Sequence, residues 1–147
     1  MDGAWGRVGR LRGAGVLVVL PAAGEGVEAC IAIQKWLQQN PVVAGSGNPV
    51  QIQMGVESGE VVEIDGDCYG DAVNSAARLA DLAGAEQILT TQRVRDALTP
   101  LFRAQLRGLG PLFLRGKSDA TGLFRVDCHS YRDYDSSVIG PSLSYTC

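Results

Sequence analysis

Asn74 and Arg78 lie four positions apart in the run VNSAAR, which spans residues 73–78. In a helix, residues four apart are neighbours on one face. A carboxamide can orient a hydroxyl group, and a guanidinium can stabilise the charge of a phosphate. The pair is therefore a candidate site for phosphate chemistry. The alternative from the pattern alone is a solvated helix face on which Arg78 pairs with Asp81.

A helix over residues 71–83 would hold this pair. Small and apolar residues recur there at helical spacing and predict a narrow inner face that packs closely on a sheet: Val73, Ala76, Ala77 and Ala80. Gly84 is predicted to end the helix in the left-handed conformation. A second helix is predicted over 26–39, with an inner face formed by Val27, Cys30, Ile31 and Leu37.

Alternation of apolar and polar residues over 50–56 predicts a strand with one buried face. Ser58-Gly59 is predicted to turn the chain into a second strand, 60–64, that pairs with the first as a hairpin. Further elements are expected in order: a buried strand over 16–20, a strand over 87–90, a short helix over 91–98, and strands over 102–109 and 123–126.

Composition excludes several classes of protein. The 147 residues suit one globular domain, and the net charge of −3 favours no general polyanion, so nucleic acid is not an expected partner. The apolar run 16–23 is far shorter than the ~20 residues of a membrane span, so a cytoplasmic location is predicted. Four scattered cysteines and one histidine suggest neither a zinc site nor a disulfide framework.

Four longer segments resemble the catalytic domain of the class III adenylyl and guanylyl cyclases. They are VQIQMGVESGEVV (50–62), DCYGDAVNSAARL (67–79), QILTT (87–91) and LRGKSDATGLFRV (114–126), and the resemblance covers roughly residues 6 to 127. It implies an α+β, ferredoxin-like nucleotidyl cyclase domain over 1–128 that lacks its first strand and first helices. Residues 129–147 are predicted to be a tail or linker.

The resemblance implies conversion of ATP to 3',5'-cyclic AMP and pyrophosphate. Members of the family use two divalent metal ions, Mg²⁺ or Mn²⁺, held by two aspartates, and build their sites between two domains. The implied partners are thus ATP and a second domain, in a homodimer or with a complete cyclase domain.

Individual roles follow from the same resemblance. Asn74 matches the residue that orients the ribose, and Arg78 the one that meets charge at the α-phosphate. Asp67 matches a carboxylate that selects adenine, Arg115 a cation for the terminal phosphates, and Arg10 a second base-recognition position. The alternatives are a solvated loop acid for Asp67 and ordinary surface arginines for the other two.

The metal ligands depart from the family pattern. The resemblance implies that Ala14 occupies the position of one metal-binding aspartate, and the strand expected to carry the other is not found in this sequence. No aspartate occurs between Asp2 and Asp65, and a methyl group cannot bind Mg²⁺. The chain alone is therefore predicted to be inactive, and strand 50–56 is predicted to lack its usual neighbour. One alternative is a non-catalytic pseudocyclase that dimerises or senses nucleotide. The other is that the first dozen residues reflect a truncated or misassigned gene start and that the natural protein is an ordinary cyclase.

Overall fold

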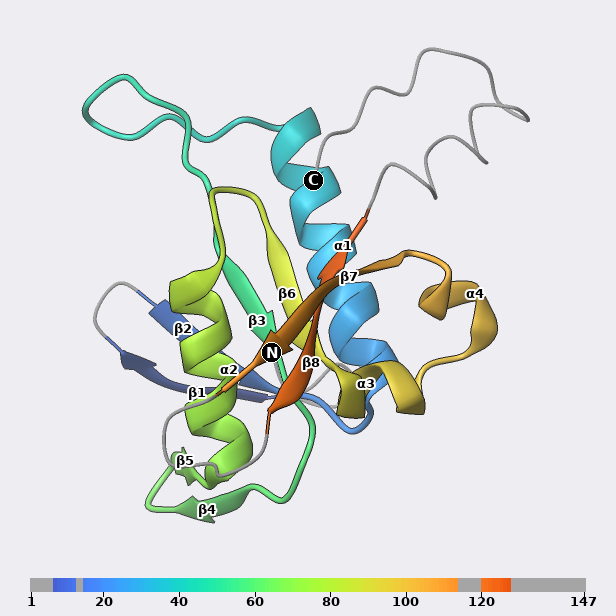
Figure 1. Ribbon diagram of the computed structural model, residues 1–147. Helices are drawn as coiled ribbons and strands as arrows, with labels where there is room; N and C mark the ends of the chain where they lie inside the picture. The colour runs from blue at the N-terminus through green and yellow to red at the C-terminus, as the bar shows by residue number, and fades with distance from the viewer. Residues whose placement is uncertain (1–6, 13–14, 114–119, 128–147) are drawn as a thin grey trace.

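The computed structural model describes residues 7–12, 15–113 and 120–127, except for the side chains of 7–12 (Figure 1). Helices and strands mix along the chain, which confirms the predicted α+β class. The elements are β1 (Arg7–Arg12), β2 (Gly15–Val19), α1 (Ala23–Gln39), β3 (Met54–Val56), β4 (Val62–Ile64), β5 (Asp67–Tyr69), α2 (Asp71–Leu82), β6 (Ile88–Thr91), α3 (Gln92–Ala97), α4 (Pro100–Arg103), β7 (Leu106–Leu112) and β8 (Thr121–Val126).

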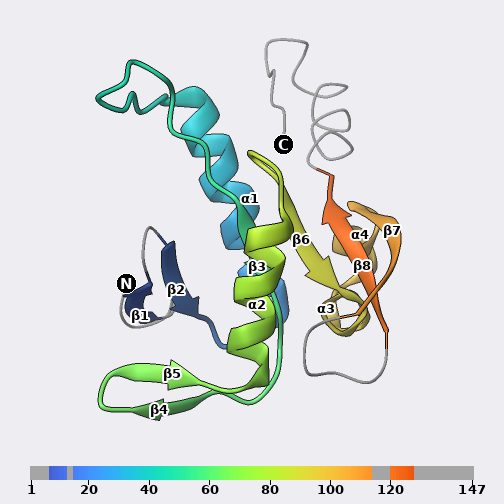
Figure 2. The same ribbon diagram turned by 60° about the vertical axis from the view of Figure 1, so that its left-hand side comes forward.

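The main sheet has the strand order β3-β6-β8-β7. β3 runs parallel to β6, whereas β8 is antiparallel to both β6 and β7. No other described strand pairs with β3, so it forms one edge of this sheet among the described residues. The strand pairs β1-β2 and β4-β5 form separate two-stranded sheets (Figure 2).

Helices cover both faces of the main sheet. On one face, α1 and α3 pack against β3, β6 and β8 through a cluster of buried apolar residues: Val27, Ile31, Met54, Val56, Ile88, Val94, Leu98 and Val126. On the other face, Leu79 and Ala83, from α2 and its end, pack against Leu89 of β6. Burial of these residues supplies the main apolar contribution to stability.

The apolar face of β3 is buried, as predicted, and the opposite face is covered as well. Met54 and Val56 point into the larger cluster, whereas Gly55 lies directly under α2. A β-carbon at Gly55 would lie 2.3 Å from the carbonyl oxygen of Ala76, well inside van der Waals contact. Only glycine lets the backbone of the helix approach the strand this closely.

The predicted hairpin between strands 50–56 and 60–64 is wrong. β4 pairs instead with β5, in the register Val62↔Tyr69. Asp65 and Gly66 connect these strands with φ values of 51° and 79°, the positive angles of the tight turn that joins right-twisted strands. The Asp-Gly pair was the stronger turn signal, because both central residues of such a turn need positive φ and Asp-Gly accepts it more readily than Ser-Gly.

Smaller differences concern burial and helix ends. β2 was predicted to be buried, but Val16 is 60% exposed because β2 pairs only with β1 among the described strands. Gln34 takes an unexpected place on the inner face of α1, where its Nε2 donates to the carbonyl oxygen of Ile52 at 3.0 Å. α2 ends without a left-handed Gly84; the positive φ of 65° occurs at Glu86.

In the described part of the chain, no helix has the length and apolar character of a membrane span.

Candidate functional site

The hairpin β4-β5 leads directly into α2 through Gly70. The φ of Gly70 is 140°, and a β-carbon there would lie 2.7 Å from the carbonyl oxygen of Glu60. The carbonyl of Gly70 accepts a hydrogen bond from the backbone N–H of Asn74 at 3.2 Å, which starts the helix. A side chain at position 70 would therefore disturb the backbone that sets the direction of α2.

Asn74 and Arg78 lie on the outer face of α2, and both are exposed. The inner face is formed by Ala72, Val73, Ser75 and Leu79. Ala77 was predicted to be inward but is exposed, because the inner face is centred on Leu79. Within the described residues, Arg78 forms neither a hydrogen bond nor an ion pair, so the alternative of a bridge to Asp81 is wrong.

Asp67 is a buried residue of β5, only 4% exposed. Its Oδ1 accepts a hydrogen bond from the backbone N–H of Cys68 at 2.9 Å, and it takes part in further interactions. The alternative of a solvated loop acid is therefore wrong. Burial of a carboxylate is costly unless donors surround it, and the N–H of Cys68 is one such donor.

The structure places Asp67 and the two α2 residues on adjoining elements. β5 and α2 contact each other, and a single residue, Gly70, separates them in the chain. No direct bond joins Asp67 to Asn74 or Arg78 among the described interactions. Arg10 lies on β1, which contacts β5, but its side chain is not described. Arg115 and Ala14 lie outside the described residues.

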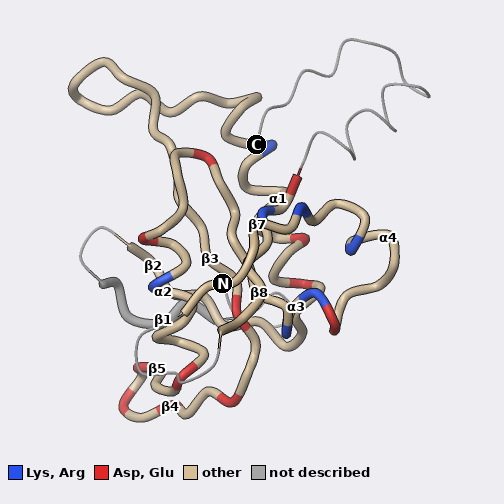
Figure 3. Tube along the Cα trace, viewed as in Figure 1, with Lys and Arg blue, Asp and Glu red and all other residues tan. Residues whose placement is uncertain are grey.

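Acidic residues dominate the surroundings of this region (Figure 3). Those between β3 and the start of α2 are Glu57, Glu60, Glu63, Asp65, Asp67 and Asp71. From position 51 to 86, Arg78 is the one basic residue of the sequence. A negative potential of this kind attracts cations and opposes a bare triphosphate, and Arg78 is the group on α2 that would favour phosphate.

The described residues do not fit the pair of divalent ions that the resemblance implies. They include no group of three or more His, Cys, Asp or Glu side chains arranged to hold a metal ion. In the sequence, Ala14 offers no oxygen at its position.

The sequence reasoning missed two glycines that position the site. Gly55 allows α2 to lie against β3, and Gly70 aims its first turn. A lone glycine inside a strand pattern signals a bulge or a close backbone approach, and Gly55 carried that signal. Gly70 carried a weaker one, because a glycine before a helix is common for several reasons.

A protein-family comparison matches residues 25–126 to the model described as "Adenylate and Guanylate cyclase catalytic domain". The match spans most of the chain, including both β5 and α2. The chain belongs to this family.

Sequence relatives of this cyclase domain cover only part of it. A protein from Mycobacterium tuberculosis (strain H37Rv), named as uncharacterized, is 40% identical over 67 residues, which are 46% of this chain and 17% of that protein. A putative adenylate cyclase 3 from Rhizobium meliloti is 35% identical over 78 residues, which are 53% of this chain and 13% of that protein. The chain thus spans less than a fifth of the length of these curated relatives.

Among solved structures, the cyclase domain resembles an adenylate/guanylate cyclase/hydrolase from Silicibacter pomeroyi. The TM-score is 0.67 at 22% sequence identity, with 84% of this chain and 73% of that chain covered. At this identity the likeness establishes the fold, and it agrees with the α+β arrangement described above.

Proposed function

We propose that this domain acts as one half of a class III adenylyl cyclase site, completed by a second domain. Asn74 and Arg78 would stabilise the transition state, and the second domain would supply the metal-binding carboxylates. The observation that carries this proposal is the position of the pair. Both side chains are exposed on the outer face of α2, and Arg78 has no partner among the described residues.

The proposed reaction is attack of the ribose 3'-hydroxyl on the α-phosphorus of ATP. A P–O bond forms to the 3'-oxygen, the hydroxyl loses its proton, and pyrophosphate leaves with the electrons of the broken bond. The carboxamide of Asn74 would orient the ribose, while the guanidinium of Arg78 would stabilise charge that develops at the α-phosphate. Mounting both groups on one helix keeps their spacing fixed during the reaction.

Asp67 is proposed to favour adenine over guanine. A carboxylate has lone pairs on two oxygens and can accept from the exocyclic amine of adenine as well as from the N–H of Cys68. The same carboxylate would repel the carbonyl oxygen of guanine. Its low exposure strengthens this selectivity, because buried charges are weakly screened by salt.

A complementation assay tests the proposal. The partner is a complete class III adenylyl cyclase domain in which the transition-state Asn and Arg are replaced by Ala but both metal-binding aspartates are intact. We expect cyclic AMP from the mixture and none from either protein alone. Replacing Asn74 or Arg78 with Ala should lower this activity by about 10²- to 10³-fold, the usual loss for a group that stabilises the transition state.

Asp81→Asn is the matched control, since Asp81 is also exposed on α2. Its activity in the mixture should be unchanged. Light scattering must show that the two domains associate. If they associate and produce no cyclic AMP, the proposal of a catalytic half-site is wrong.

The alternative of a nucleotide-sensing pseudocyclase makes a different prediction. Calorimetry would then show that the chain binds ATP without metal, that Asp67→Ala weakens this binding, and that no mixture turns ATP over. Absence of nucleotide binding together with absence of turnover would leave a dimerisation role.

A further inference from the structure

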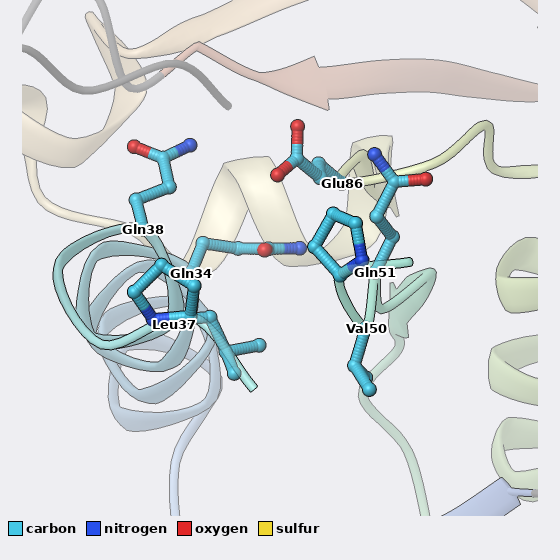
Figure 4. Close-up of a pocket in the computed structure, with 8 residues that line it drawn as sticks. Gln34, Leu37, Gln38, Val50, Gln51 and Glu86 are labelled. Atoms are coloured by element: carbon cyan, nitrogen blue, oxygen red, sulfur yellow. The ribbon is translucent and has the colours of Figure 1, made fainter. Parts of the chain in front are cut away.

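A pocket of about 290 Å³ lies at the end of the domain where α1 finishes (Figure 4). Its walls come from the last turns of α1, from the segment 49–51 before β3, and from the turn before β6. Asp67 lies instead on the β4-β5 hairpin at the start of α2, whereas Glu86 of the pocket follows the end of α2. The pocket is thus distinct from the candidate cyclase site.

Glu86 is the one charged residue among those that line the pocket. It is partly buried, and within the described part of the chain its carboxylate forms no hydrogen bond or ion pair. The other polar groups on the lining are the neutral amides of Gln34, Gln38 and Gln51. An anionic ligand would meet this carboxylate without a compensating cation, so the lining favours a positive charge.

The backbone fixes the position of Glu86. Its φ of 65° is one that residues other than glycine rarely adopt. Hydrogen bonds hold the turn on both sides: Gln87 N–H donates to the carbonyl of Gly84 at 3.0 Å, and Met54 N–H donates to the carbonyl of Gln87 at 3.0 Å. A conformation of this kind persists where its surroundings determine it, and ligand sites are a common place for it.

The opposite wall is held by Gln34, which is 1% exposed. Its Nε2 donates to the carbonyl of Ile52 at 3.0 Å and so joins α1 to the segment that enters β3. Figure 4 shows this side chain reaching from α1 toward the segment that carries Gln51. This hydrogen bond joins α1 to the segment before β3 before any ligand enters. Little backbone conformational entropy of these two walls would therefore be lost on binding.

Apolar groups line the remainder of the pocket, from Leu37, Val50 and two prolines. Such groups contact carbon chains, while the amides and the carboxylate can accept hydrogen bonds from N–H groups. The volume is at the small end of ligand sites, which suits a head group and a few carbons. We propose that this pocket binds a small organic cation with a guanidinium or ammonium head on a short aliphatic chain.

Titration with n-butylguanidinium, followed by ¹⁵N NMR of the full chain, tests the proposal. We expect saturable shifts at Gln51 and Glu86, and none with n-butyrate or n-butanol at the same concentrations. Glu86→Gln should weaken binding by about tenfold or more, as expected for loss of a charge-assisted hydrogen bond. Glu28→Gln is the matched control, because Glu28 is an exposed acid of α1 that does not line the pocket.

Gln51→Lys is a second test that leaves the buried residues untouched, since Gln51 is exposed. The added cation should abolish binding of n-butylguanidinium. Unsaturable shifts, equal binding of n-butyrate, or unchanged affinity of Glu86→Gln and Gln51→Lys would each overturn the proposal. None of these outcomes depends on cyclase activity.

Discussion

Replacing Gly55 with Ala should destabilise the domain strongly, because α2 lies directly on this residue. The new β-carbon would lie 2.3 Å from the carbonyl oxygen of Ala76, 2.6 Å from the nitrogen of Ala80 and 2.7 Å from the β-carbon of Leu79. Backbone atoms and β-carbons have no side-chain torsion by which to move away. The helix itself must shift, by about 1 Å if the contact of 2.3 Å is to reach the 3.4 Å of ordinary van der Waals contact.

The cost is expected near the upper end of the usual range for overpacking, at about 3 kcal/mol in the free energy of unfolding. For a domain of this size, that corresponds to a decrease of about 6–12 °C in Tm. Thermal unfolding followed by circular dichroism measures it. In the complementation assay, a helix displaced by about 1 Å should also reduce cyclic AMP production by up to about 100-fold.

Gly45→Ala is the matched control. No atom lies within 4 Å of the β-carbon that this change would add, and the φ of Gly45 is outside the left-handed region. Its Tm should stay within a degree or two of the unmodified chain, on the scale of ordinary surface substitutions. If Gly55→Ala unfolds at the same temperature as Gly45→Ala, the close packing of α2 on β3 is wrong.

Two further changes test the packing of α1 and α2. Burial raises the pKa of the Cys30 thiol from 9.0 to about 12. As the pH rises, the thiol of the unfolded chain ionises before that of the folded chain. The contribution of Cys30 to stability is therefore complete below about pH 9 and declines toward pH 12. At pH 10 the free energy of unfolding, measured in urea, should fall by about 1.4 kcal/mol relative to that of Cys30→Ala. An equal pH dependence of both proteins would contradict this pKa. Leu79→Ala should cost about 3 kcal/mol because Leu79 is fully buried, while Leu82→Ala, 54% exposed on the same helix, should change stability by less than about 0.5 kcal/mol; similar losses for both would show that α2 is oriented differently.

Local patterns in the sequence predicted much of the secondary structure. The helices over 26–39 and 71–83 were found within a few residues, because apolar spacing and flanking stop signals act within one segment. The pairing of strands was harder. β4 pairs with β5 through the Asp65-Gly66 turn rather than with β3, and a short apolar run carries little information about its neighbour.

In the candidate site, too, local spacing could be predicted from the sequence but burial could not. The spacing of Asn74 and Arg78 placed them on one face of a helix, and the structure has both side chains exposed. Spacing could not show that Asp67 is buried, since burial depends on elements that pack over β5 from elsewhere in the chain. The proposed roles of these three residues stay predictions until the complementation assay is done.

The sequence by itself determined the family, the α+β class, and the four-residue interval that groups an amide with a guanidinium. These properties depend on the order of residue types and on helix geometry, both of which are local. Tertiary structure decided which face of α2 is inward, why Gly55 must be glycine, and that Glu86 and Gln34 line one pocket. Those features join segments distant in the chain, so they follow from packing at near-crystalline density, which no local pattern specifies.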